Sequence, residues 1–234
     1  MGRPAVAVAG AIGHAACMAL AAHSATSFVY RAAPGHFSRR KWLAYVTAGE
    51  ALGFIVPGIT WLTGWKLGLP ALPLAALVVV AGAGEGAVLG WSQWRVLRGW
   101  QPAVTARWVR LTAIAAAISW ALGMAPSTAY DLGAPTLAAI AVGVAGAPFL
   151  LVTIGTAQWL VLHRFVPRAW RWIAVNAVAW FVALPPTFIG PALVPADAPV
   201  ALDLAVWGVA GLLMAAILAA VTGAAMARLV REVG

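Results

Sequence analysis

The chain has 234 residues, of which 63% are hydrophobic and only 9% are charged. Soluble domains carry about 25% charged residues, so this composition excludes an ordinary soluble protein. Apolar runs recur along the chain, and each reaches the roughly 18 residues that let a helix cross a bilayer core of about 30 Å. We therefore predict an all-α, polytopic integral membrane protein that forms a single domain over residues 1–234 and contacts membrane lipid.

The net charge of +9 and the single cysteine each bear on a further class of function. A strongly basic chain can bind nucleic acid, but here the arginines stand at the ends of the apolar runs. Membrane topology and anionic lipid explain that placement, so we expect no nucleic-acid partner. Cys17 has no second cysteine to pair with, which excludes an internal disulfide and a cysteine-based zinc site.

The apolar runs predict seven transmembrane helices, at roughly 5–28, 42–64, 71–94, 108–126, 135–162, 171–190 and 203–227. The first run has the composition of a signal peptide, because Arg3 precedes it and small residues follow near 22–25. A cleaved signal would leave the basic loop 29–41 outside the cell, whereas a retained helix places that loop in the cytoplasm. We therefore interpret residues 5–28 as a transmembrane helix.

The loop charges predict the orientation of the chain in the membrane. Every lysine and arginine except Arg3 and Lys66 falls on one side of the predicted spans, in loops 29–41, 95–110 and 163–171 or at the C-terminus. The positive-inside rule places that side in the cytoplasm. We therefore predict a multi-pass protein of the inner (plasma) membrane, with its N-terminus outside and its C-terminus inside.

A sequence motif repeats at the ends of two predicted spans. Gly90-Trp-Ser-Gln93-Trp-Arg-Val-Leu-Arg98 closes the third span, and Gly155-Thr-Ala-Gln158-Trp-Leu-Val-Leu-His-Arg164 closes the fifth. The last span closes on 223–231, with the same spacing from glycine to arginine but without Gln-Trp. Such self-similarity is typical of structural repeats.

The spans that follow these ends also begin alike, with a basic residue and a tryptophan at Lys41-Trp42, Arg107-Trp108 and Arg171-Trp172. We therefore predict helical hairpins over about 5–64, 71–126 and 135–190, followed by a lone helix at 203–227. Counted from these tryptophans, Glu50 aligns with Ala116 and Trp180. A hairpin can thus form without a carboxyl group at that position.

The doubled G-x-x-Q-W-x-V-L-(R/H) motif, with its basic turn and Trp-led helix, resembles a pattern in uncharacterised multi-spanning bacterial membrane proteins. The resemblance covers roughly 84–186 and implies about seven helices without implying an activity. Chain length, helix count and sparse buried carboxylates also resemble the integral-membrane terpene cyclases. That second resemblance implies an isoprenoid substrate.

Three ionisable residues are predicted at similar depth in the membrane. At about 1.5 Å per helical residue, Glu50 and His23 lie about 12 Å from the basic edge and Glu85 about 15 Å. Burying such a group costs at least about 2.5–3.5 kcal/mol. We therefore predict a shared pocket in which all three are catalytic. The alternative is structural: neutral acids bonded to a neighbouring backbone, or a Glu50–His23 pair that fixes helix packing.

Aromatic and amide side chains supply candidate substrate-binding residues. Trp120 and Trp180 are the tryptophans predicted deep enough to face a cavity, and Gln93, Gln158 and Asn176 complete the candidate set. Cross-linking of helix ends is the alternative role for the two glutamines. Most other tryptophans are predicted to form interfacial belts. These are Trp42, Trp91, Trp94, Trp100, Trp108, Trp159, Trp170 and Trp172 at the basic side and Trp61 and Trp65 opposite.

Small residues and prolines predict how the helices pack. Gly82, Gly86 and Gly90 are spaced by four, a pattern that lets helices approach closely. Pro185-Pro186 is predicted to bend or end the sixth span. The sequence contains no HExxH, no Walker loop, no aspartate-rich diphosphate–Mg²⁺ motif and no lysine in the last span to hold retinal. We therefore expect no metal and no cofactor.

Three functions fit these observations. The first is a membrane enzyme acting on a hydrophobic prenylated small molecule, in which Glu50 or Glu85, kept protonated by burial, donates a proton. Trp120 and Trp180 would stabilise the resulting carbocation. Such a substrate is expected to enter from the cytoplasmic leaflet. The second is a small-molecule or proton-coupled transporter, and the third is a non-catalytic scaffold or accessory subunit.

Overall fold

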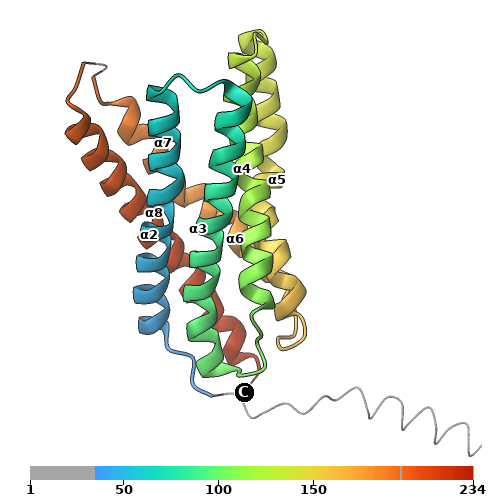
Figure 1. The fold of residues 1–234 in the computed structure, drawn as a ribbon. Helices are drawn as coiled ribbons and strands as arrows, with labels where there is room; N and C mark the ends of the chain where they lie inside the picture. The colour runs from blue at the N-terminus through green and yellow to red at the C-terminus, as the bar shows by residue number, and fades with distance from the viewer. Residues whose placement is uncertain (1–34, 196, 234) are drawn as a thin grey trace, which may run out of the picture. The chain divides into compact units, whose positions relative to one another are not determined.

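The computed structural model describes residues 35–195 and 197–233. Within them the chain forms helices only: α2 (Arg39–Lys66), α3 (Ala71–Trp100), α4 (Arg107–Asp131), α5 (Thr136–Leu162), α6 (Arg171–Ala183), α7 (Pro185–Ala192) and α8 (Val200–Arg231). Figure 1 shows them running up and down in one bundle. The predicted span 5–28, with His23 and Cys17, lies outside the described residues.

Six helical segments in the described part are long and apolar enough to cross a membrane, with α6 and α7 counting together as one. They match the predicted spans from 42–64 onward, so the multi-pass, all-α prediction is confirmed for this part of the chain. The helices are longer than the predicted spans. For example, α3 continues past Arg95 and Arg98 to Trp100, because a charge ends an apolar run without ending a helix.

The helices close into a ring. Each of α2, α3, α4, α5 and α6 packs against its neighbours in the chain, and α8 packs against both α6 and α2. The last helix, predicted to stand alone, therefore completes the ring. All described arginines lie at the helix ends on one side of the bundle, which we call the basic end.

The sixth span is broken where the sequence predicts it. α6 ends at Ala183 and α7 begins at Pro185, with Pro185 and Pro186 in its first turn. Proline has no N–H to continue the helix but fits a first turn, where that N–H would have no partner. The Leu184 N–H donates to the Trp180 carbonyl and the Leu184 carbonyl accepts from Thr187 N–H. The break therefore costs few backbone hydrogen bonds.

The core at the basic end corrects the belt prediction for four tryptophans. Trp42, Trp100, Trp108 and Trp172 are at most 1% exposed. Trp172 packs between the other two span-leading tryptophans, with ring centroids 6.1 Å from Trp42 and 6.4 Å from Trp108. Their position near the basic ends of the helices is as predicted. The sequence could not show that they turn towards the ring's interior and away from lipid.

The two glutamines of the repeated motif join this core. The Trp108 indole N–H donates to Gln93 Oε1 at 3.0 Å, and the Trp172 indole N–H donates to Gln158 Oε1 at 2.9 Å. The Gln158 amide in turn donates to Gln93 Oε1 at 2.7 Å and to Thr112 Oγ1 at 3.1 Å. The α3–α4 and α5–α6 hairpins thus form the same Gln–Trp bond, and one amide links the two.

The closing glycine of the motif also has one role in both hairpins. A Cβ on Gly90 would lie 2.9 Å from Thr112 Cβ, and a Cβ on Gly155 would lie 2.8 Å from Asn176 Cβ. These partners occupy equivalent positions, four residues after Trp108 and Trp172. The predicted packing role of the glycines is confirmed, because each lets the two helices of its hairpin meet closely.

Candidate functional site

The buried tryptophans at the basic end, together with Gln93 and Gln158, form what we call the Gln–Trp core. A cavity of about 270 Å³ lies inside the ring, beyond this core and away from the basic end. Every described helix contributes to its wall. Its lining residues are Glu50, Phe54, Pro57, Gly58, Trp61, Glu85, Gly86, Leu89, Ala116, Ser119, Trp120, Gly123, Met124, Leu150, Ile154, Trp180, Leu184, Thr187, Phe188, Trp207 and Met214. Almost all of these side chains are apolar or aromatic.

The repeat determines which residues face this cavity. Eight residues after the leading tryptophans of α2, α4 and α6 stand Glu50, Ala116 and Trp180, and all three line it. The same holds twelve residues after them, at Phe54, Trp120 and Leu184. Three repeat-related helices therefore present one register to a shared space. The carboxyl group occupies only one of three equivalent positions, so it is an addition to the repeated framework.

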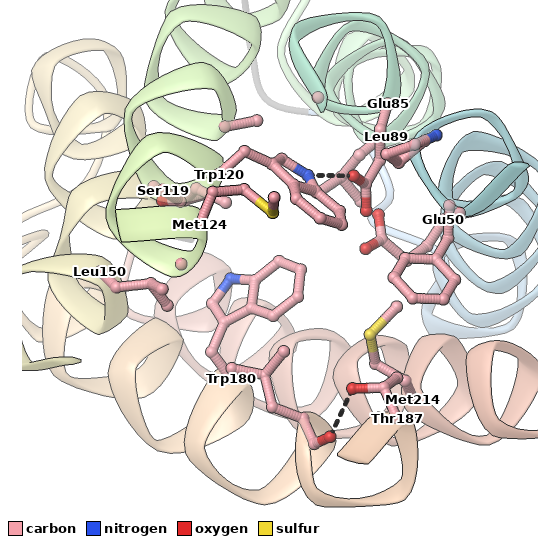
Figure 2. A pocket seen from close by; sticks show the side chains of 18 of the residues that line it. Glu50, Glu85, Leu89, Ser119, Trp120, Met124, Leu150, Trp180, Thr187 and Met214 are labelled. Carbon is pink, nitrogen blue, oxygen red and sulfur yellow. Dashed lines mark hydrogen bonds between the residues drawn. The ribbon is translucent and has the colours of Figure 1, made fainter. Parts of the chain in front are cut away.

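The carboxyl groups of Glu50 and Glu85 face each other at the inner end of the cavity (Figure 2). Glu50 on α2 is 0% exposed and Glu85 on α3 is 5% exposed. The two helices approach closely here because residue 53 is glycine: a Cβ on Gly53 would lie 3.2 Å from Glu85 Cα. The sequence predicted the common depth of these carboxyls, and the structure brings them together.

Trp120 contacts this pair from α4. Its indole N–H donates to Glu85 Oε2 (Figure 2). The indole ring lies against Gly82, where any side chain would overlap it. The absence of a Cβ at Gly82 therefore lets the ring reach Glu85.

Several other polar groups of the cavity have no partner, although the Thr187 hydroxyl donates to the Leu184 carbonyl at 2.7 Å. Among the residues that the structure describes, the buried side-chain atoms without a hydrogen bond are both carboxyl oxygens of Glu50, Ser119 Oγ and Trp180 Nε1. All three residues line this cavity. Buried polar groups are nearly always hydrogen-bonded, so a concentration of unpaired ones in a single cavity points to a bound partner with polar atoms of its own.

A row of aromatic rings leads from the carboxyl pair to the opposite end of the bundle. Trp120 packs beside Phe54 at 6.2 Å between centroids, Phe54 beside Trp207 at 6.1 Å, and Trp207 beside Trp61 at 6.1 Å. Trp61 stacks on Trp65 at 6.0 Å with the rings 3° from parallel. We call Trp120, Phe54, Trp207, Trp61 and Trp65 the aromatic row.

The cavity reaches the surface at the end away from the basic loops. Its residues there include Phe188, which is exposed, and Trp61 and Met124, which are half-buried. Towards the basic end the packed Gln–Trp core closes it. A ligand entering from the basic side, as the sequence led us to expect, would have to pass this core, because the tryptophans assigned there to a lipid-facing belt instead fill the interior.

The predicted site residues fall into three groups. Glu50, Glu85, Trp120 and Trp180 line the cavity. Gln93, Gln158 and Asn176 do not line it and bond within the framework, where the Asn176 amide donates to the Trp172 carbonyl at 3.0 Å. His23 lies outside the described residues. Of the predicted set, the four lining residues are thus the ones placed to meet a ligand.

Sequence reasoning missed much of the aromatic wall. Phe54 and Trp61 follow Glu50 at spacings of four and eleven residues, which place them on one helical face. That periodicity could have identified them. Trp207 on α8 carries no comparable signal, because apolar residues surround it in the sequence.

Comparison with known proteins does not assign a function to this chain. No protein-family model, no curated protein and no solved structure matches this chain. Within residues 35–195 and 197–233, no group of three or more histidine, cysteine, aspartate or glutamate side chains is placed to hold a metal ion. The chemistry must therefore be argued from the two carboxyls and the aromatic wall.

Proposed function

We propose that this protein is an integral-membrane enzyme that isomerises or cyclises an unsaturated, isoprenoid-like lipid by proton transfer. One observation carries the proposal: two buried carboxyl groups meet at the inner end of an otherwise apolar, aromatic-lined cavity. An ionisable residue inside a membrane protein marks a functional site by default. An apolar cavity that exposes two such residues to its contents is suited to act on an apolar substrate.

The two carboxyls take different roles in this proposal. Glu50 is the proton donor, because it is the more deeply buried of the two, which favours its neutral form, and apart from the facing Glu85 its oxygens have no partner in the described residues. Its O–H bond breaks as the π electrons of a substrate C=C bond form a new C–H bond, which leaves a carbocation and a carboxylate. A second C=C bond can then attack the cation and close a ring. Loss of a neighbouring C–H proton to Glu85 forms the final C=C bond.

The cavity walls support the cationic intermediate. The faces of Trp120, Trp180 and Phe54 are electron-rich and attract a positive charge. The apolar lining also excludes water that would otherwise trap the cation as an alcohol. The product would be an isomer of the substrate, because the proton gained at the start equals the proton lost at the end.

The test is product profiling with purified protein in lipid. Wild type and the variants Glu50→Gln and Glu85→Gln would receive linear prenylated and epoxidised substrates, with products read by mass spectrometry and NMR. We expect wild type to form a product of unchanged mass and Glu50→Gln to lose it by at least about 100-fold, the effect typical of a missing general acid. Glu232→Gln is the matched control, because Glu232 pairs with Arg171 at the surface. Full turnover by both cavity variants would refute these roles.

A proton-coupled transporter is the second candidate, and the α6–α7 break supports it. Discontinuous helices that line a central site are common in secondary transporters. Here Leu184, Thr187 and Phe188, at the break, all line the cavity, which is closed towards the basic end. Substrate-dependent proton flux in liposomes without chemical conversion would favour this function. Folded protein with neither conversion nor flux would favour a scaffold.

A further inference from the structure

We propose that the cavity binds a lipophilic monocation, an ammonium group with an aliphatic chain, with the charged head at Glu50 and Glu85. The chain would lie along the aromatic row towards the open end. This inference rests on and deepens the proposed function, since an ammonium group carries the single positive charge of the carbocation intermediate on a centre of similar size. It concerns binding alone, so it can hold even if turnover fails.

Glu50 and Glu85 have no basic partner in the described part of the chain. The ion pair in that part, Arg171 with Glu232, lies at the surface and away from the cavity. All described arginines stand at the basic end, beyond the Gln–Trp core. Two facing carboxyls can share one proton, which leaves one negative charge. In an apolar medium that charge is costly, and a cation beside it would stabilise it.

The unpaired atoms indicate that the ligand enters this pair. Glu50 is 0% exposed, and apart from the facing Glu85 its oxygens have no partner among the described residues, although Glu50 lines the cavity. Trp180 is 8% exposed and its Nε1 is also unpaired. A cation at Glu50 would satisfy the carboxylate. The unpaired N–H of Trp180 can donate to a hydroxyl or ether oxygen carried by the same ligand.

The aromatic row supplies the second element of cation recognition. Cations bind over indole and phenyl faces within about 6 Å. One such contact exists at the outer end of the aromatic row, where the Lys66 ammonium lies 5.9 Å from the centre of the Trp65 ring. Trp120 connects the inner end of the row to Glu85 through its hydrogen bond. A charged head can therefore exchange one ring face for the next on its way inward.

The charge at the open end favours a cation over an anion. Asp131 is the last residue of α4 there, and Asp197 and Asp203 lie in the α7–α8 connection and the first turn of α8. Lys66 is the one described basic residue at that end. An entrance of this sign raises the local concentration of cations and lowers that of anions such as diphosphates.

The experiment measures binding of radiolabelled decyltrimethylammonium to full-length protein in lipid nanodiscs, with empty nanodiscs subtracted. Dodecanol and decyl sulfate compete as the neutral and anionic counterparts. We expect saturable binding that neither competitor displaces at equal concentration. Removing one partner of a buried charge pair costs upward of 2 kcal/mol, so Glu50→Gln/Glu85→Gln should weaken binding by about 30-fold or more. Glu232→Gln should leave it unchanged.

A second variant covers the case in which the double variant does not fold. Trp207→Leu keeps an apolar residue but removes a ring from the aromatic row. It should weaken decyltrimethylammonium by about two- to thirtyfold, the range of a cation–π contact, and leave dodecanol binding unchanged. Equal wild-type affinity for the cation and dodecanol, or cation binding indifferent to these substitutions, would overturn the inference. Product formation without cation selectivity would overturn the cation-binding inference and support the proposed enzyme. Selective cation binding without any product would support the inference and count against the enzyme.

Discussion

Trp172 and Trp180 lie two turns apart on α6, and their indole N–H groups meet opposite surroundings. Trp172 donates to Gln158 Oε1 inside the framework of the repeat. Trp180 is nearly as buried but donates to nothing in the described residues. Polar atoms in this molecule thus divide into those that hold helices together and those that face the cavity.

This division predicts opposite effects of the same substitution. Trp172→Phe should lower the free energy of unfolding by about 1–3 kcal/mol, because it leaves a buried amide oxygen unpaired. Trp180→Phe removes an N–H that has no partner to lose, so its unfolding free energy should change by less than about 1 kcal/mol. Thermal unfolding of both variants in one detergent measures the difference. Equal destabilisation would contradict the separation into framework and site.

The sequence predicted the depth of residues better than their direction. A rise of about 1.5 Å per residue was enough to bring Glu50 and Glu85 into one layer. Rotation about the helix axis depends on neighbours that only the closed ring specifies. The belt prediction therefore succeeded for Trp91, which is 49% exposed, and failed for Trp108, which is 0% exposed. Both lie near the same basic loop.

At the scale of elements, two glycines lie on opposite faces of α3 and differ in what a side chain at their position would contact. Gly86 lies against α4, where a Cβ would be 2.9 Å from the Thr112 carbonyl oxygen and 3.0 Å from Ala113 Cα. Gly84, half a turn away, is exposed and a Cβ there would meet nothing within 4 Å. The first glycine is needed for contact between helices, and the second is not.

Alanine at these two positions should therefore act in opposite directions. Gly86→Ala forces the backbones of α3 and α4 apart, and we expect a loss of about 1–3 kcal/mol of stability, as in other overpacked contacts. Gly84→Ala meets no atoms and gains helix propensity, so it should be neutral or stabilising by up to about 1 kcal/mol. The readout is the melting temperature of each variant in matched detergent. A destabilised Gly84→Ala variant would show that this face is covered by a partner.

The repeat could be identified from the sequence, but not all of the contacts that its residues make could be predicted. Gln93 and Gln158 were recognised as equivalent, and each pairs with the tryptophan that opens the next helix. α8 carries the third copy without glutamine, and its Thr222 accepts the indole N–H of Trp42 at 3.1 Å. That partner comes from α2, which is distant in the sequence. Closure of the ring cannot be inferred from pairs of adjacent helices.

At the scale of the whole molecule, the unequal ends determine which side of the membrane the cavity serves. The basic end holds every described arginine and the packed core, whereas the cavity reaches the surface at the other end. Positively charged loops remain on the cytoplasmic side. The orientation that we predict therefore turns the open end away from the cytoplasm.

Cysteine labelling in intact cells tests this orientation. In a Cys17→Ser background, Leu67→Cys lies in the exposed α2–α3 turn at the open end, and Ala103→Cys lies in the exposed α3–α4 loop at the basic end. A membrane-impermeant maleimide should label Leu67→Cys directly and Ala103→Cys only after permeabilisation. This outcome would mean that a hydrophobic substrate reaches Glu50 from the outer leaflet. The reverse pattern would turn the cavity towards the cytoplasm, and the substrate would have to be one drawn from the inner leaflet.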